Sequence, residues 1–378
     1  MVPEGACSAK ELTENDQLRQ IYAIYYGNRK AAVLAVAQRY RVFDFLEARE
    51  PAGATLDDIV QAYGFSVRGT KALLLALEYL NLVKIANDRY FLAPSSRQFL
   101  VSTAPESVAG LIDLEFSEFI TPSALDQALR SGRPQVYDAV PDVWQQHQQD
   151  TERCVRFTAA MHAISSGPAR AMVQRLALEP HWGLHASLAT RPHRLLDVGG
   201  GSGCYAIEWM RHAPVPNSEA DVLETPACSR VTQHYIDEAA SSIQPNRIRV
   251  LPGDMFTEEA YGDANRYTHV LLSQILHDWP VRSEASSAPR RDGERLVELA
   301  WRALSPGGVL VVHEKLVHDE DSAMVTIDML HWTQGQQYTE AMMRELLRDA
   351  HFIEVRFRKT PHTYWWLALA QRPFTPST

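Results

Sequence analysis

The stretch RLLDVGGGSGCYAIEWMRH, residues 194–212, decides the fold of this chain. Apolar residues lead into a glycine-rich turn, and a helical pattern follows directly, which predicts a strand, a turn and a helix. Glycine adopts backbone angles that other residues avoid, and it lets a ligand approach the main chain near the positive end of the helix. This turn is therefore a candidate ligand site.

Two common interpretations of such a glycine turn do not fit. The dinucleotide pattern G-x-G-x-x-G from Gly199 requires glycine at position 204, where this chain has Cys204. The phosphate-binding P-loop requires the string G-K-[ST] at the end of the glycine turn, and this chain has no such string there. What remains is G-x-G-x-G at Gly199, Gly201 and Gly203, with an acid, Asp197, near the end of the preceding strand.

Outward from this turn, residues 181–378 alternate short apolar runs with helical stretches. This pattern predicts an α/β domain with a mainly parallel sheet. The runs are HRLLDVGG, ADVLET, IRVLPGD, THVLLSQ and GGVLVVHE. The final pair, IEVRFRKT and TYWWLALAQ, leaves no room for a crossover helix, so these strands must be antiparallel neighbours at one end of the sheet.

The N-terminal part, residues 1–110, has a different texture. A helix is expected from Leu18 to Ala48, followed by helices capped by Thr55 and Ser66 and by two short strands that turn at Asn87-Asp88. This order is typical of a winged helix. DNA binding and dimerisation are both open, but the candidate recognition helix offers little positive charge, which favours dimerisation. Residues 111–180 read as a helical connection, broken by SGRPQ and SSGP.

Composition excludes several classes of protein. The 378 residues are 46% hydrophobic and 22% charged, as in a globular protein of two or three domains. A net charge of −9 argues against general binding to nucleic acid or to anionic membranes. The four cysteines are widely spaced, so neither a zinc site nor a disulfide framework is expected. No long apolar run or signal-like start is visible, and we expect a soluble cytoplasmic protein.

Acidic residues end the next two predicted strands. Glu224 follows DVL, where a carboxylate could accept two hydrogen bonds from a ribose diol. Asp254 follows LPG and could accept a hydrogen bond from an amine, and the flexible thioether of Met255 suits an adenine face. Each residue alone could be an ordinary loop or core residue. Together they lie at the sheet edge where open α/β folds bind ligands.

The motifs LLDVGGGSG, GDMF, LLSQILHDWP and LSPGGVLVVHE resemble those of the S-adenosylmethionine (SAM)-dependent small-molecule O-methyltransferases. This family includes caffeate-type plant enzymes, acetylserotonin O-methyltransferase and many enzymes of natural-product synthesis. The resemblance covers nearly the whole chain and implies a Rossmann-like class I methyltransferase domain after a winged-helix dimerisation domain. It also implies a set of cofactor-binding residues: Asp197, Gly199 and Gly201 at the methionine moiety, Glu224 at the ribose, and Asp254, Met255 and Ser273 at the adenosine.

Methyl transfer to a hydroxyl group needs a base, and the resemblance places it at His277 in HDWP. Neutral histidine is available near pH 7 and could take the proton. Glu314 is the expected orienting partner on the other ring nitrogen. The family often carries a second glutamate in G-x-E-R-T, where this chain reads GQQYT with Gln337. Ser273 is another departure, because plant members have lysine there.

The sequence gives fewer signals for the residues of the acceptor pocket. Matching family segments line the acceptor site, which implies Phe157, Met161, His162, Met329 and Trp332, although such residues are also common in cores. We therefore expect a SAM-dependent O-methyltransferase that acts on a small aromatic acceptor as a homodimer through its N-terminal region. Three alternatives remain: N-methylation, a non-methylating reaction on the same fold, and a winged-helix regulator that binds SAM. Residues 281–294 are longer than usual for the family and are expected to form a surface loop.

Overall fold

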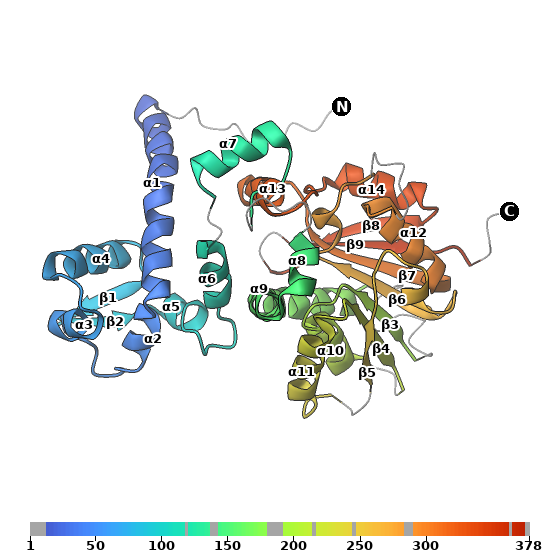
Figure 1. Ribbon diagram of the computed structural model, residues 1–378, viewed down its shortest axis with the longest axis horizontal. Helices are drawn as coiled ribbons and strands as arrows, with labels where there is room; N and C mark the ends of the chain where they lie inside the picture. Colours follow the sequence, from blue (N-terminus) through green and yellow to red (C-terminus); the bar gives the residue numbers. More distant parts are fainter. Residues whose placement is uncertain are drawn as a thin grey trace, which may run out of the picture. The chain divides into compact units, whose positions relative to one another are not determined.

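The computed structural model describes residues 13–117, 120–136, 143–179, 192–213, 217–243, 247–282, 290–362 and 365–374. Contacts divide the chain into two compact units, Met1–Phe116 and Ser117–Thr378. Each unit contains hydrophobic core of its own. Figure 1 shows the helices and strands of both units.

The N-terminal unit is mainly helical. Asp58 completes a capping box with Thr55, and Ser66 caps the next helix, as predicted. The hairpin turns at Asn87 and Asp88, which both have positive φ. Two helices and the hairpin thus form the predicted winged-helix pattern. The elements are α1 (Glu14–Arg39), α2 (Val42–Glu47), α3 (Leu56–Tyr63), α4 (Val67–Tyr79), β1 (Val83–Ala86), β2 (Arg89–Leu92), α5 (Pro94–Phe99) and α6 (Ala109–Ser117).

The prediction of one continuous helix from Leu18 to Ala48 is wrong. The chain breaks between α1 and α2 because Arg41 adopts the left-handed conformation, with φ 53°. The Arg41 side chain pairs with Asp113 at 2.6 Å. The bend directs Phe43 and Leu46 into the core, where both are buried. A straight helix would have carried these side chains along the axis of α1 instead.

The C-terminal unit is built on a seven-stranded sheet in the order β5-β4-β3-β6-β7-β9-β8. The neighbouring strands β5, β4, β3, β6 and β7 are parallel to one another. Strand β9 is antiparallel to β7 and to β8, and the antiparallel pairing of the last two strands is as predicted. The strands are β3 (Arg194–Val198), β4 (Glu219–Glu224), β5 (Ile248–Pro252), β6 (Tyr267–Ser273), β7 (Leu304–Lys315), β8 (Ile353–Lys359) and β9 (Trp365–Gln371). The chain runs outward from β3 in one direction and then returns to β6 on the other side. The carboxyl ends of β3, β4 and β6 therefore form a topological switch point, where such sheets bind ligands.

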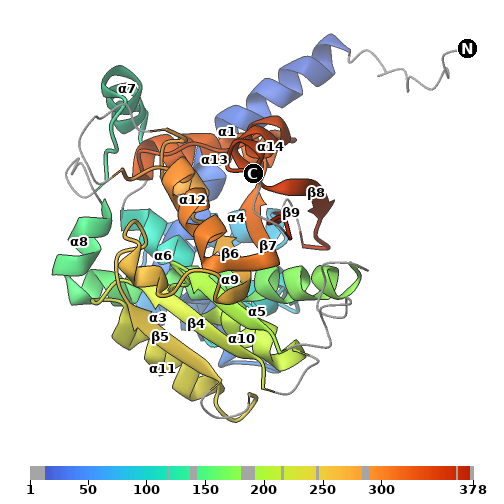
Figure 2. The same ribbon diagram turned by 90° about the vertical axis from the view of Figure 1, so that its right-hand side faces the viewer.

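Helices cover both faces of this sheet, as Figures 1 and 2 show. Residues of α9, α10 and α11 pack into one core, and residues of α12 and α14 pack into the other. The helices are α7 (Pro122–Ser131), α8 (Val143–Gln149), α9 (Thr151–Ala177), α10 (Cys204–His212), α11 (Ser229–Ala239), α12 (Gly293–Ala303), α13 (Glu320–Trp332) and α14 (Glu340–Asp349), with short 3-10 turns at Glu259–Tyr261 and Leu276–Asp278.

The SSGP segment does not break a helix, contrary to the prediction. Helix α9 continues through Pro168, which is buried. Proline inside a helix removes one backbone hydrogen bond and costs about 3 kcal/mol. Burial of Met172, Val173 and Leu176 on the following turns offsets that cost through packing. Tertiary packing thus overrides the local preference of this segment.

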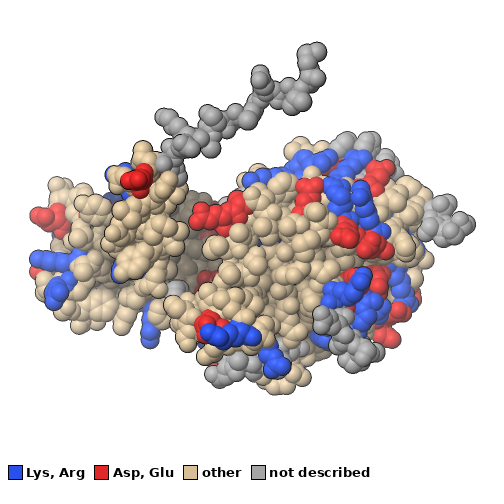
Figure 3. Space-filling model, turned by 90° about the horizontal axis from the view of Figure 1, so that it is seen from above, with Lys and Arg blue, Asp and Glu red and all other residues tan. Residues whose placement is uncertain are grey.

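Lys and Arg side chains lie among Asp and Glu side chains on the face drawn in Figure 3. The described part of that face therefore lacks the continuous basic surface that a nucleic-acid backbone attracts. Within the described ranges, no helix combines the length and apolar character that spanning a membrane requires.

Candidate active site

The glycine turn joins β3 to α10 and leaves main chain exposed to a ligand. Gly199, Gly201 and Gly203 have φ of 63°, 57° and 75°, which favour glycine. A Cβ added to Gly199 would lie 2.6 Å from Ile275 and 3.6 Å from the sulfur of Met255. The turn, the Met255 thioether and the segment before His277 therefore meet at one place.

Asp197 is buried at the end of β3 without a clear partner. Neither carboxylate oxygen makes a well-aligned hydrogen bond with a described residue. Burial raises the pKa of Asp197 to about 7, although the backbone N–H of Ala206 partly opposes this shift. A buried carboxylate without partners destabilises a fold, and such groups are concentrated at functional sites.

Glu224, at the end of β4, holds the glycine turn. Its Oε2 accepts a hydrogen bond from the N–H of Gly201 at 3.0 Å, and its Oε1 accepts one from the N–H of Thr225 at 2.6 Å. Burial raises the pKa of Glu224. The predicted ribose acid thus lies beside the predicted methionine-binding glycines.

Asp254 lies two residues after the end of β5, and its carboxylate makes two contacts. Its Oδ1 accepts a hydrogen bond from the N–H of Phe256 at 3.1 Å, and its Oδ2 pairs with Arg291 at 2.7 Å. Arg291 was not predicted as a site residue, because it lies in residues 281–294, which were expected to form a surface loop. The nearby acids Asp292 and Glu294 were the only signal at this position, and that signal was weak.

Ser273 ends β6 and is buried. The side chain of the next residue, Gln274, contacts Ser165 and Tyr205. Gln274 has φ 56°, and its Nε2 donates to Ser165 Oγ at 2.7 Å and lies 3.4 Å from Tyr205 OH. Tyr205 OH in turn lies 3.0 Å from His313 Nδ1. A buried polar chain therefore connects α9, α10 and β7 through Gln274, which the sequence analysis did not select.

His277 lies in the 3-10 turn after β6 and is held by Glu314 of β7. Nδ1 of His277 lies 2.5 Å from Oε2 of Glu314. A carboxylate can only accept, so the ring donates its Nδ1–H and leaves the lone pair on Nε2. Burial lowers the pKa of His277, but Glu314 and Asp278 outweigh it and the net shift is upward. Burial raises the pKa of Asp278 to about 7, against the opposing effect of His277.

Gln337 is buried in the segment between α13 and α14. Neither the oxygen nor the nitrogen of its side-chain amide has a hydrogen-bond partner among the described residues. Two residues earlier, Gly335 packs so closely that an added Cβ would collide with the carbonyl oxygen of His277. The segment that carries Gln337 thus reaches the turn that carries the histidine.

The expected acceptor residues separate into groups. Phe157 packs against Trp144 and His147, with ring centroids 5.5 and 4.6 Å away. His162 contacts the glycine turn instead, with Nδ1 2.8 Å from Ser202 Oγ and its ring stacked on Tyr235 at 4.2 Å. The remaining residues, Met161, Met329 and Trp332, are partly buried on α9 and α13.

A disulfide joins Cys154 of α9 to Cys228, whose Cα atoms are 6.2 Å apart, and the expectation of no disulfide is wrong. The two cysteines are 74 residues apart, and only the tertiary fold brings them together. The bond ties α9 to the segment after Glu224. Cys204 is free and buried. Cys7 lies outside the described residues. Among the described residues, no group of three or more His, Cys, Asp and Glu could hold a metal ion.

The comparisons with known proteins agree with this geometry. Residues 123–353 match an O-methyltransferase domain, and residues 23–102 match an O-methyltransferase dimerisation domain. The 3-hydroxy-5-methyl-1-naphthoate 3-O-methyltransferase of Streptomyces sahachiroi is 26% identical over 337 residues, covering 87% of this chain and 88% of that protein. Acetylserotonin O-methyltransferase of Mus musculus molossinus is 29% identical over 379 residues, covering 94% and 89%. Human N-acetylserotonin methyltransferase, solved in complex with SAM, has a similar fold with a TM-score of 0.76 at 23% identity, covering 96% and 99%.

The sheet order, the glycine turn and the acids at successive strand ends define a SAM-dependent α/β methyltransferase. The chain belongs to the O-methyltransferase family whose members carry an N-terminal dimerisation domain. SAM is therefore the cofactor. The buried, unpartnered Asp197 and the open glycine turn fit a ligand with a positive charge and a flexible chain, such as the methionine part of SAM.

Proposed function

We propose that this chain methylates a hydroxyl group of a small aromatic secondary metabolite, with His277 as the general base. The pairing of His277 with Glu314 beside the glycine turn carries this proposal. The named relatives that act on naphthoate, acetylserotonin and tetracenomycin substrates support an aromatic acceptor.

When bound, SAM supplies an electrophilic methyl group on a sulfonium ion. Nε2 of His277 would take the proton from the acceptor hydroxyl as the oxygen–methyl bond forms and the sulfur–methyl bond breaks, with S-adenosylhomocysteine as the leaving group. Glu314 keeps Nδ1 protonated and stabilises the imidazolium that results. A phenol with pKa near 10 is only about a thousandth ionised at pH 7, so removal of its proton offsets roughly 4 kcal/mol of the barrier. The pairing with Glu314 thus supplies both orientation and charge.

The residues proposed to hold the cofactor lie at the ends of four strands, β3, β4, β5 and β6. In this proposal, Asp197, Gly199 and Gly201 surround the methionine part, and Glu224 accepts hydrogen bonds from the ribose. Asp254, Met255 and Ser273 surround the adenosine. In this structure, Glu224 accepts a hydrogen bond from the Gly201 N–H. Binding of the ribose therefore requires Glu224 either to give up this hydrogen bond or to accept from Gly201 and the ribose at the same time.

The helical connection, residues 111–180, supplies part of the acceptor pocket in this proposal through Phe157, Met161 and His162, together with Met329 and Trp332 of α13. Gln337 replaces the second family glutamate near the base. An amide cannot neutralise an imidazolium as a carboxylate does, so an acidic phenol is the favoured acceptor.

The homodimer forms through the N-terminal region, residues 1–110, in this proposal. Helix α1 exposes Ile21, Ile24 and Tyr25 on its surface, with Ile24 71% exposed. Exposed apolar surface of this kind marks a protein interface. The cytoplasmic location stays a prediction.

The decisive experiment compares wild type with His277→Ala and His277→Gln. Both variants should lose turnover by roughly 100- to 10,000-fold while binding S-adenosylhomocysteine (SAH) normally. Mass spectrometry of the product should show the gain of one methyl group, and NMR should place that group on oxygen rather than nitrogen. Unchanged turnover in both variants would contradict the role of His277. A product of unchanged mass would favour a non-methylating reaction, and salt-dependent binding to duplex DNA would favour a regulator.

A further inference from the structure

Arg291 makes an unusual set of contacts beside Asp254. Its Nη1 lies 2.7 Å from Oδ2 of Asp254. Its guanidinium group also lies over the rings of Phe256 and Trp279, with distances of 4.7 and 5.4 Å to the ring centroids. The ion pair and the two aromatic contacts fix the orientation of this planar group.

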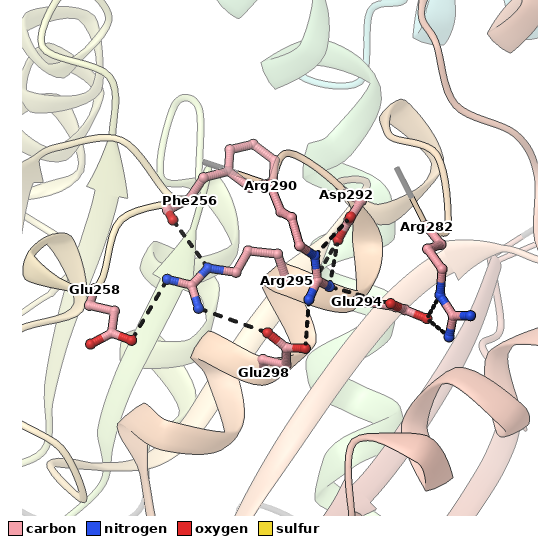
Figure 4. Close-up of polar contacts among 8 residues, drawn as sticks. All are labelled: Phe256, Glu258, Arg282, Arg290, Asp292, Glu294, Arg295 and Glu298. Atoms are coloured by element: carbon pink, nitrogen blue, oxygen red, sulfur yellow. Dashed lines mark hydrogen bonds and ion pairs between the residues drawn. The ribbon is translucent and has the colours of Figure 1, made fainter. Parts of the chain in front are cut away.

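The residues on either side of Arg291 are anchored as well. Arg290 pairs with the buried carboxylate of Asp292 at 3.1 Å, and Asp292 caps α12. Glu294 pairs with both Arg290, at 3.3 Å, and Arg282, at 2.5 Å. Figure 4 shows this cluster of ion pairs at the start of α12. The backbone of Arg291 is therefore held between anchored neighbours, while the side chains of Arg291 and Asp254 are 35% and 40% exposed.

We propose that Arg291 is a positioning residue for the adenine subsite, acting through Asp254. The inference rests on the proposed function, in which Asp254 accepts a hydrogen bond from the adenine amine. Two contacts hold the Asp254 carboxylate, from the Phe256 N–H on Oδ1 and from Arg291 on Oδ2. A carboxylate offers about four acceptor positions, so lone pairs remain for an amine. Arg291 fixes the direction in which those lone pairs point.

The test uses two ligands that differ only at the amine of the base. SAH carries an adenine amine, which donates, whereas its 6-deamino (purine) analogue carries only a C–H at that position and keeps the ring nitrogen N1 as an acceptor. Affinities of the full-length protein are measured by calorimetry. Arg291→Gln should weaken binding of SAH by roughly fivefold. It should leave binding of the deamino analogue nearly unchanged, because that ligand offers Asp254 no N–H at this position. The KM for SAM should rise without a change in kcat, and Arg291→Lys should restore part of the loss.

Arg295→Gln is the matched control. Arg295 lies on α12 and contacts the Phe256 carbonyl oxygen at 3.4 Å and Glu258 at 3.8 Å (Figure 4). No contact with Asp254 occurs among its described interactions, so both affinities should stay at their wild-type values. An equal loss for both ligands in Arg291→Gln, or no loss for either, would overturn the inference. Failure of the wild-type protein to bind SAH would contradict the proposed function and this inference with it.

Discussion

Glu314 holds His277 through one carboxylate oxygen and the backbone beside it through the other. Oε2 lies 2.5 Å from the ring Nδ1, while Oε1 accepts hydrogen bonds from the N–H groups of Ile275 and Leu276, each at 3.0 Å. One buried side chain therefore sets the position of the turn, the tautomer of the ring and the charge beside it. Any change at Glu314 should affect all three.

Glu314→Gln should lower kcat/KM by roughly 10- to 100-fold and move the acid limb of its pH profile to lower pH. Glu314 raises the pKa of His277, and the neutral ring is the form that accepts a proton. Removing the negative charge lowers that pKa, so neutral histidine persists to lower pH. The measurement is kcat/KM across the acidic and neutral range. Glu320→Gln, an exposed carboxylate on α13, is the control and should leave the profile unchanged. If the acid limb of the kcat/KM profile does not shift in Glu314→Gln, that result would contradict the assignment of this limb to His277.

Asp197→Asn should stabilise the unliganded protein and abolish stabilisation by SAH. The folded pKa of Asp197 is about 7, above the ordinary 3.8, so ionisation of this acid disfavours the folded state. The contribution of Asp197 to the free energy of unfolding of the wild type therefore falls as the pH rises from about 4 towards 7. Above that range the variant should gain roughly 1–3 kcal/mol in the free energy of unfolding.

Thermal unfolding with and without SAH, over a pH series, measures both effects of Asp197→Asn. Asp221→Asn is the matched control, because Asp221 is also buried but is bonded to Arg249, Arg266 and Tyr267. That variant should be less stable than the wild type. A destabilised Asp197→Asn would show that the carboxylate has a structural role.

Reduction of the disulfide should lower the melting temperature. A bond that closes a loop of this length restricts the unfolded chain, and its loss costs roughly 2–4 kcal/mol. Cys154→Ser should melt at the same temperature with or without dithiothreitol. Cys204→Ser removes the free buried thiol and should still respond to reductant. If the wild type ignores the reductant, the bond between Cys154 and Cys228 does not form in solution.

Gly335→Ala should lower kcat while affinity for SAH is preserved. An added Cβ collides with the backbone of His277, so the turn that carries this proposed base must move. Displacement of a reacting group by about 1 Å can cost 100-fold in rate. Gly27→Ala, where nothing lies within 4 Å of the new Cβ, is the control and should keep full activity. Equal kcat in both variants would show that Gly335 does not affect the function of the turn that carries His277.

Much of the fold was predictable because it depends on local patterns. Alternation of apolar runs with helical stretches predicted the sheet, and the caps Thr55 and Ser66 were correct. Two local rules failed. Pro168 lies inside α9, and Arg41 interrupts a sequence with a continuous helical pattern. In both places, packing against distant residues outweighs the local preference of the chain.

The sequence by itself determined the strands, the glycine turn and the acids that follow successive strands, because each depends on residues close together in the chain. It also contained the histidine that we propose as the general base. Only the tertiary structure decided which atoms meet: Glu314 with His277, Arg291 with Asp254, Cys154 with Cys228. These pairs join residues 37 or more positions apart. Their contacts depend on how helices and strands pack, and spacing in the sequence carries no record of that packing.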